Sequence, residues 1–218
     1  MQSKVPLISL CLVAGLTGLY LQLFGLNLPV KPGEAPAPEI ENFLWPDETP
    51  LGNFELVNQD HGTFDRADLL DKWSFLFFGY THCPDICPVT MHTLRQVSGQ
   101  LRSSGKTDPD QFNFVFVSVD GERDTPDHLK RYVEFFDPGF IGITGNREQV
   151  DSLASQLSVP YHIEEHPAGA REYLVHHSGA IFLISPQGRL ATLFQTPHDV
   201  DRITERFFAI ETFTGQQS

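Results

Sequence analysis

Two long apolar runs constrain the fold of this chain most strongly. Trp73–Tyr80 and Phe112–Val119 consist almost wholly of aromatic and aliphatic residues, without the polar alternation of a strand that has one face in water. They therefore predict two strands at the centre of a sheet, buried on both faces. Apolar residues at near-helical spacing predict a helix between them, from Pro88 to about Ser103. Strand, helix and strand predict a right-handed crossover that joins two parallel strands.

The flanking segments supply the other elements of one domain. They predict a hairpin over Phe54–Phe64 with a positive φ at Gly62, a helix from Asp124-Thr125-Pro126, a short strand at Phe140–Thr144, a helix capped by Asn146, a hairpin over Ala180–Phe194 and a helix over Asp199–Glu211. This order predicts an α/β fold: a mixed sheet flanked by helices on both faces, with an N-terminal hairpin.

The chain divides into an anchor, a linker and the domain. Val5–Val30 is a stretch of 26 uncharged residues, mostly apolar, which is long enough to cross a bilayer as one helix. Residues 1–30 are therefore a predicted transmembrane anchor. Residues 31–50 are rich in proline and acidic side chains and form a predicted extended linker. The predicted domain spans residues 51–218.

A cleaved signal peptide is the alternative for the anchor. The apolar run is longer than the usual signal core of about 7–15 residues, and the Ala-x-Ala site at Ala35–Ala37 is followed by Pro38, which favours retention. Lys4 precedes the helix and several glutamates follow it, which predicts that the domain faces outward. No Arg- and Ser-rich presequence precedes the helix. We expect a single-pass protein of the bacterial inner membrane with its C-terminal domain in the periplasm.

The charge balance restricts the partners. Against 28 acidic residues the chain has 15 lysines and arginines, a formal net charge of −13. Nucleic-acid binding requires a basic surface, so this balance argues against it. It favours a basic or metal-receiving protein partner.

The three cysteines are too few for a disulfide framework. Cys11 lies in the apolar N-terminal run, whereas Cys83 and Cys87 lie between the first buried strand and the helix after it. Sites in open α/β sheets form at such carboxyl ends of strands. The four-residue spacing allows the pair either to form a redox-active disulfide or to bind one metal ion. The predicted cap position of Cys87 would stabilise a thiolate.

A third soft or borderline ligand must come from a histidine. The chain has nine, most of them in predicted turns, loops and exposed helix positions that favour a surface role. His82 adjoins Cys83, but its side chain is expected to point away from both sulfurs. His176 and His177 enter a predicted strand side by side, and successive side chains of a strand point to opposite faces. Only one of these two can reach the site.

Three ordered segments resemble the signature segments of the SCO/SenC proteins. They are Gly79–Pro88, which contains both cysteines, Val117–Pro126, and Tyr173–Ser178. Proteins of that family are membrane-anchored, thioredoxin-fold copper proteins of cytochrome c oxidase assembly. The resemblance extends from about Leu51 to the final helix and implies a thioredoxin-like fold for the domain.

The resemblance implies that copper, as Cu(I) or Cu(II), is bound by Cys83, Cys87 and His177. Two thiolates and an imidazole are soft enough for Cu(I), whereas a structural zinc site normally has four protein ligands. The chain departs from the family pattern at His176, where an aspartate is usual, and this leaves open whether His176 contributes. It departs again at Gly121, where a proline is usual.

Two acidic residues match positions near the family's site. Asp120 and Asp124 are candidates to orient His177 or to steer a partner. For Asp124, capping of the helix that follows is the favoured role.

Two functions follow from these residues. The first is a copper metallochaperone that assists assembly of the binuclear copper centre and passes copper to the copper-receiving subunit of cytochrome c oxidase. The second is a thiol–disulfide oxidoreductase that reduces the cysteines of that subunit and is itself served by a thiol reductant protein. A thiol peroxidase is a weaker variant of the second. Copper binding requires His177, whereas dithiol exchange requires only the cysteines.

Overall fold

The structure is a computed structural model that describes residues 44–45, 50–106 and 108–215. The predicted anchor over residues 1–30 and most of the predicted linker lie outside the described residues. Within the described part, no helix combines the length and the apolar character needed to cross a membrane.

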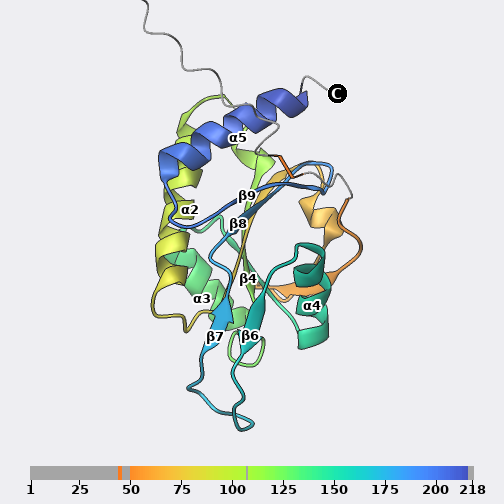
Figure 1. Cartoon of the computed structure of the whole chain (residues 1–218), viewed down its shortest axis with the longest axis vertical. Coiled ribbons are helices and arrows are strands. Elements are labelled where there is room, and N and C mark those ends of the chain that lie inside the picture. Colours follow the sequence, from red (N-terminus) through yellow and green to blue (C-terminus); the bar gives the residue numbers. More distant parts are fainter. Residues whose placement is uncertain (1–43, 46–49, 107, 216–218) are drawn as a thin grey trace, which may run out of the picture. The chain divides into compact units, whose positions relative to one another are not determined.

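A mixed seven-stranded sheet forms the centre of the domain, in the order β2-β1-β5-β4-β3-β8-β9 (Figure 1). Its strands are β1 (Glu55–Asn58), β2 (Thr63–Asp65), β3 (Trp73–Gly79), β4 (Phe112–Ser118), β5 (Ile141–Thr144), β8 (Ile181–Ile184) and β9 (Leu190–Phe194). The three central strands β5, β4 and β3 run parallel, while β1 and β8 pair antiparallel to their outer edges. The predicted mixed sheet and both hairpins are confirmed.

The two apolar runs form the central strands because both faces of the sheet are covered. Every residue of β3 is buried. Successive side chains of a strand alternate between faces, so Phe75 and Phe77 enter one hydrophobic cluster while Leu76 and Phe78 enter the other. Each buried side chain of this size contributes about 1.5–3 kcal/mol to stability, and this burial fixes the register of β3.

The helices divide between the two faces. On one face lie α2 (Ile86–Ser103), α3 (Pro126–Phe136) and α5 (Val200–Gly215), whose apolar residues join the cluster of Phe75 and Phe77. On the other lies α4 (Arg147–Gln156), together with the short 3-10 helix η2 (Arg66–Leu69) (Figure 1). A second 3-10 helix, η3 (Pro109–Gln111), leads into β4.

A separate two-stranded ribbon lies outside the main sheet. It pairs β6 (Tyr161–Ile163) antiparallel with β7 (Val175–His177), and it places Tyr161 opposite His177 and His162 opposite His176. The predicted strand containing the two histidines is therefore confirmed, but it belongs to this ribbon.

Three local predictions are wrong in position. Helix α2 begins at Ile86, two residues before Pro88, because a proline in the first helical turn needs no intrahelical N–H bond. Thr125, not Asp124, caps α3 and accepts a hydrogen bond from the backbone of His128. In the first hairpin the positive φ belongs to His61, at 61°, and not to Gly62. Asn146 caps α4 as predicted.

Candidate metal centre

Three potential metal ligands converge at the carboxyl end of β3. One ligand atom each from Cys83, Cys87 and His177 lies within 4.8 Å of the other two. In the described part of the chain, no other group of three histidine, cysteine or acidic side chains is as close. Both cysteines are free thiols. The structure therefore brings together the three residues that the family resemblance implied as ligands.

The two cysteines reach the centre from different local structures. Cys83 lies in the turn after β3, where its backbone N–H donates to the carbonyl of Tyr80 at 3.2 Å, and its side chain is half-buried. Cys87 is the second residue of α2 and is fully buried. The cap residue is Asp85, so the predicted cap position of Cys87 is wrong by two residues. A turn and the first helical turn together close the gap between the sulfurs.

His177 enters the centre from the ribbon, 90 residues after Cys87. Its Nε2 lies 3.3 Å from Cys87 Sγ, and its Nδ1 lies 3.0 Å from the carbonyl oxygen of Ser178. Donation from Nδ1–H to that carbonyl fixes the ring and turns Nε2 toward the sulfurs, as in many metal-binding histidines. Phe77 and Tyr80 contact the ring edge-on, with centroids at 6.0 and 5.7 Å.

The neighbouring histidine faces away. The side chain of His176 is 66% exposed, and its Nε2 lies 3.4 Å from a carboxylate oxygen of Glu164. Strand alternation thus sends His177 to the thiols and His176 to solvent, as the sequence pattern required.

The two thiols differ in acidity. A hydrogen bond from the Cys87 side chain lowers the pKa of the Cys83 thiol to about 3, a contact with His177 acts in the same direction, and burial opposes both. The pKa of Cys87 is raised, because its proton is held in the hydrogen bond to Cys83 and because the thiol is buried. Cys83 is therefore the thiolate of the pair. The prediction that the helix start favours a Cys87 thiolate is wrong.

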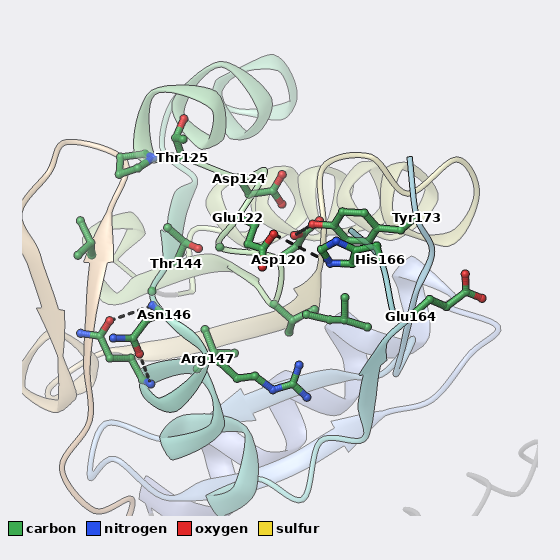
Figure 2. Close-up of a pocket in the computed structure, with 18 of the residues that line it drawn as sticks. Asp120, Glu122, Asp124, Thr125, Thr144, Asn146, Arg147, Glu164, His166 and Tyr173 are labelled. Carbon is green, nitrogen blue, oxygen red and sulfur yellow. Dashed lines mark hydrogen bonds and ion pairs between the residues drawn. The ribbon is translucent and has the colours of Figure 1, made fainter. Parts of the chain in front are cut away.

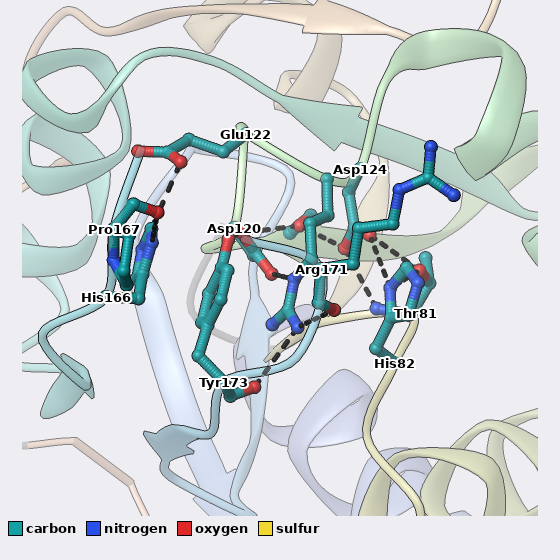
Figure 3. A network of polar contacts seen from close by, with 11 residues as sticks. Thr81, His82, Asp120, Glu122, Asp124, His166, Pro167, Arg171 and Tyr173 are labelled. Carbon is teal, nitrogen blue, oxygen red and sulfur yellow. Dashed lines mark hydrogen bonds and ion pairs between the residues drawn. The ribbon is translucent and has the colours of Figure 1, made fainter. Parts of the chain in front are cut away.

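Asp124 secures the loop that contains Cys83. Its fully buried carboxylate accepts hydrogen bonds from the Thr81 backbone at 2.8 Å, from the Thr81 hydroxyl at 2.5 Å and from the Ser118 hydroxyl at 2.6 Å (Figure 3). Asp124 therefore joins the end of β4 to the residues just before Cys83. The capping role favoured by the sequence is wrong, and His177 is oriented by Ser178 instead.

Asp120 belongs to a second polar cluster that holds the segment between β6 and β7. It pairs with Arg123 and accepts a hydrogen bond from the hydroxyl of Tyr173 at 2.6 Å. The Arg123 guanidinium lies 3.4 Å from the centre of the Tyr173 ring, and the ring of His166 stacks at 3.7 Å from it. These distances place Arg123 and His166 on opposite faces of Tyr173.

Arg123 also binds the backbone of this segment. Its Nη1 donates to the carbonyl oxygens of Arg171 at 3.2 Å and Tyr173 at 3.1 Å. Figure 3 shows the resulting network, in which Tyr173 and Arg171 meet the loop of Asp120. We call these contacts of Arg123 with Asp120, Arg171 and Tyr173 the Arg123 clamp, and the sequence analysis did not predict it. His166 was also expected on the surface, whereas its side chain is only 13% exposed.

An open cleft of about 960 Å³ lies beside this network, between the loop after β4 and the start of α4 (Figure 2). Asp120 and Asp124 line it, but Cys83, Cys87 and His177 do not. The metal centre is therefore a compact site and not part of the cleft.

The other histidines bear out a mostly structural or surface role. His82 lies near Thr81 and packs edge-on against His128, outside the group of converging ligands. His61 pairs with Asp127 on the surface, and His92 is exposed on α2.

Known proteins resemble this chain over the domain that contains the three converging ligands. The SCO1/SenC family model matches residues 46–210. A relative from Stutzerimonas stutzeri, named as a candidate copper-binding protein, is 38% identical over 158 residues, which is 72% of this chain and 75% of that protein. An SCO2-like protein from Rickettsia prowazekii is 31% identical over 210 residues, 95% of this chain and 98% of that protein. The mitochondrial SCO1 homolog 1 of Arabidopsis thaliana is 36% identical, but the match covers only 45% of its length.

Solved structures show the same fold. The copper-bound ScoI of Arabidopsis thaliana is similar with a TM-score of 0.68 and 34% identity, covering 75% of this chain and 99% of that one. Apo Sco1 from Thermus thermophilus is similar with a TM-score of 0.67 and 32% identity, covering 77% and 94%. Copper-bound yeast Sco1 is similar with a TM-score of 0.65 and 29% identity, covering 72% and 87%.

Proposed function

The chain belongs to the SCO1/SenC family, and from that premise we propose that it binds copper and delivers it for assembly of the binuclear copper centre of cytochrome c oxidase. The observation that supports this most directly is the convergence of Cys83, Cys87 and His177 within 4.8 Å.

The donor set fits copper. Two sulfurs and one imidazole nitrogen are soft and borderline ligands of the kind that Cu(I) prefers, and copper leads the affinity series of the divalent metals. A structural zinc site would need a fourth protein ligand. Three ligands leave a position open through which an incoming thiolate can begin an exchange. That openness suits a copper ion that is cargo.

The three ligands have different parts in the transfer. Cys83 is half-buried and already a thiolate, so it is the ligand that a target thiolate reaches first. Cys87 is fully buried and is released last. Binding of copper by both sulfurs displaces the proton of Cys87, and release of copper restores it.

The predicted anchor and linker place this chemistry near its target. We propose that residues 1–30 span the bacterial inner membrane and that the domain faces the periplasm. A flexible linker then keeps the domain at a raised effective concentration near a membrane oxidase subunit. The acidic surface implied by the net charge of −13 would favour a basic docking face on that subunit.

The second candidate function is thiol–disulfide exchange, and it is favoured by the unequal thiols. The Cys83 thiolate would attack a partner disulfide and release one partner thiolate. Cys87 would then give up its proton and attack the mixed disulfide at Cys83. The partner is reduced to a dithiol, the pair is oxidised to a disulfide, and a separate thiol reductant protein restores it.

An anaerobic Cu(I) titration of the full chain in detergent, against a competing chelator, tests the copper proposal. In His177→Ala we expect the Cu(I) affinity to fall at least tenfold, since even loss of a residue that only orients a ligand costs about 10–100-fold. Exchange with a small disulfide should keep its rate. His92→Ala is the matched control, because His92 is exposed on α2 and lies outside the group of three converging ligands.

The outcomes separate the candidates. Unchanged Cu(I) affinity in His177→Ala would remove His177 from the ligand set, and a loss confined to His176→Ala would transfer the role to its neighbour. In cells, a Cys83→Ser, Cys87→Ser strain should fail to assemble the oxidase copper centre. Normal assembly in that strain without added copper would refute the delivery role.

A further inference from the structure

The outer face of the β6–β7 ribbon carries a second group of metal-ligand types. His162 and His176 are directly opposite one another in the antiparallel register, so their Cβ atoms stand about 4.5–5.5 Å apart. Their rings lie nearly parallel, at 17°, with centroids 6.3 Å apart. Glu164 follows His162 by two residues and so projects from the same face of the ribbon.

The contact between His176 and Glu164 is close to the spacing of two ligands of one ion. Nε2 of His176 lies 3.4 Å from Oε1 of Glu164. Neighbouring ligand atoms at about 2.0 Å from a Cu(II) ion in tetragonal geometry are about 2.8 Å apart, so the two side chains need to approach by only roughly 0.6 Å. His162 is exposed, and rotation of its side chain, a motion on the picosecond to nanosecond timescale, would bring its ring toward the same position.

We propose that His162, His176 and Glu164 form a second, solvent-exposed metal site that binds Cu(II). Two imidazoles and a carboxylate suit a borderline divalent cation, and Cu(II) has the highest affinity in that series. The site lacks sulfur, so it differs in softness from the centre of Cys83, Cys87 and His177. The net charge of −13 for the whole chain favours the approach of cations in general.

The two sites are back to back on one short strand. His176 and His177 are consecutive residues of β7, and strand alternation sends one to the exposed ligands and the other to the thiols. An ion bound at the outer face therefore lies one residue along the chain from a ligand of the inner centre. The outer site rests on its own contacts and does not require that the proposed function be correct.

The test uses the full, untagged chain in detergent with all three cysteines changed, as Cys11→Ser, Cys83→Ser, Cys87→Ser. This background removes the thiols, which Cu(II) would otherwise oxidise to a disulfide. Titration with Cu(II), followed by electron paramagnetic resonance, should show one bound equivalent with nitrogen hyperfine structure from two imidazoles. His162→Ala or His176→Ala should lower the affinity at least tenfold and remove one nitrogen from the spectrum, and Glu164→Gln should lower the affinity by a smaller factor.

The controls identify the site. His92→Ala, in an exposed helical histidine, should leave the titration unchanged, and circular dichroism should confirm that each variant is folded. The proposal is overturned if the background binds no Cu(II), if both histidines can be removed without effect, or if His177→Ala alone abolishes binding. Should the serine background not fold, the wild-type chain loaded with one Cu(I) and titrated calorimetrically with Zn(II) gives the same comparison. Loss of Cu(I) binding in His177→Ala reports separately on the proposed function.

Discussion

Gly79 leaves room for the sulfur of Cys87. A Cβ atom at Gly79 would lie 2.6 Å from Cys87 Sγ and 3.0 Å from the ring of Phe116, both inside normal contact distance. The last residue of β3 therefore lacks a side chain so that the buried thiol can lie directly against the strand.

Gly79→Ala should destabilise the domain and weaken Cu(I) binding, because the new methyl group displaces the sulfur or the Phe116 ring. Overpacking of this kind costs about 1–3 kcal/mol. Denaturant unfolding and the Cu(I) titration measure the two effects. Gly99→Ala is the matched control: nothing lies within 4 Å of a Cβ there, and alanine in a helix should stabilise it by up to about 1 kcal/mol. Equal effects of the two substitutions would contradict the packing argument.

The unequal thiols predict how alkylation depends on pH. The pKa of Cys83 is lowered to about 3, so its thiolate should react with iodoacetamide at a nearly constant rate from pH 8 down to about pH 4. Below pH 3 the rate should fall tenfold per pH unit. The raised pKa of Cys87 and its burial should leave it unlabelled. Mass spectrometry of the labelled peptides measures both rates.

Cys87→Ala provides the control for this pH profile. It removes the hydrogen bond that contributes most to the lowered pKa of Cys83, so the midpoint should move up toward the ordinary cysteine value of about 8.5. A wild-type midpoint already near that value would show that Cys83 is an ordinary thiol.

Asp124→Asn should lower the free energy of unfolding by about 1–3 kcal/mol, because an amide NH2 would face a donor where a carboxylate oxygen now accepts hydrogen bonds from Thr81 or Ser118. Urea unfolding measures this loss. Asp127→Asn, at a side chain that is 73% exposed, should change stability by less than about 0.5 kcal/mol. A similar small change at Asp124 would mean that its bonds do not secure the loop of Cys83.

Arg123→Met should release the segment between β6 and β7 and leave Asp120 buried without its charged partner, at about 3–5 kcal/mol. Hydrogen exchange of the Glu164 amide, which donates to the Leu174 carbonyl, should become faster. Tyr173→Phe keeps the stacked ring and loses one hydrogen bond, so it should cost only about 1 kcal/mol. An unchanged rate of hydrogen exchange at the Glu164 amide in Arg123→Met would show that Arg123 does not hold the segment between β6 and β7.

The central strands could be predicted because burial on both faces requires an unbroken apolar run, a sequence pattern that few other structures produce. Phe75 and Leu76 must both be apolar, although they point to opposite sides. The cap at Asn146 could be predicted equally well, because the capping of α4 depends only on residues close to Asn146 in the sequence. Asp124 was not: Asp and Thr are both good cap residues, and only the fold shows that Thr81 lies close enough to bind the aspartate.

The candidate metal centre likewise has parts that local sequence predicts and parts that depend on residues distant in the sequence. The spacing of Cys83 and Cys87 is local and predicted a pair, whereas His177 is 90 residues away and was assigned through the resemblance to a family. Alternation then required that His176 face the other side. The stacking of Arg123 on Tyr173 joins segments 50 residues apart and has no periodic or local signal, so the sequence alone offered no means of finding it.

The distance along the chain between Cys87 and His177 also sets an order of events during synthesis. At about 5–20 residues per second, the ribosome adds the 90 residues that follow Cys87, up to and including His177, in roughly 5–18 seconds. During that time the growing polypeptide has both thiols but no imidazole partner, and β8 and β9, which complete the sheet, are still missing. A newborn chain is therefore a dithiol before it is a three-ligand centre. Oxidants meet the cysteines earlier than the finished metal site can protect them.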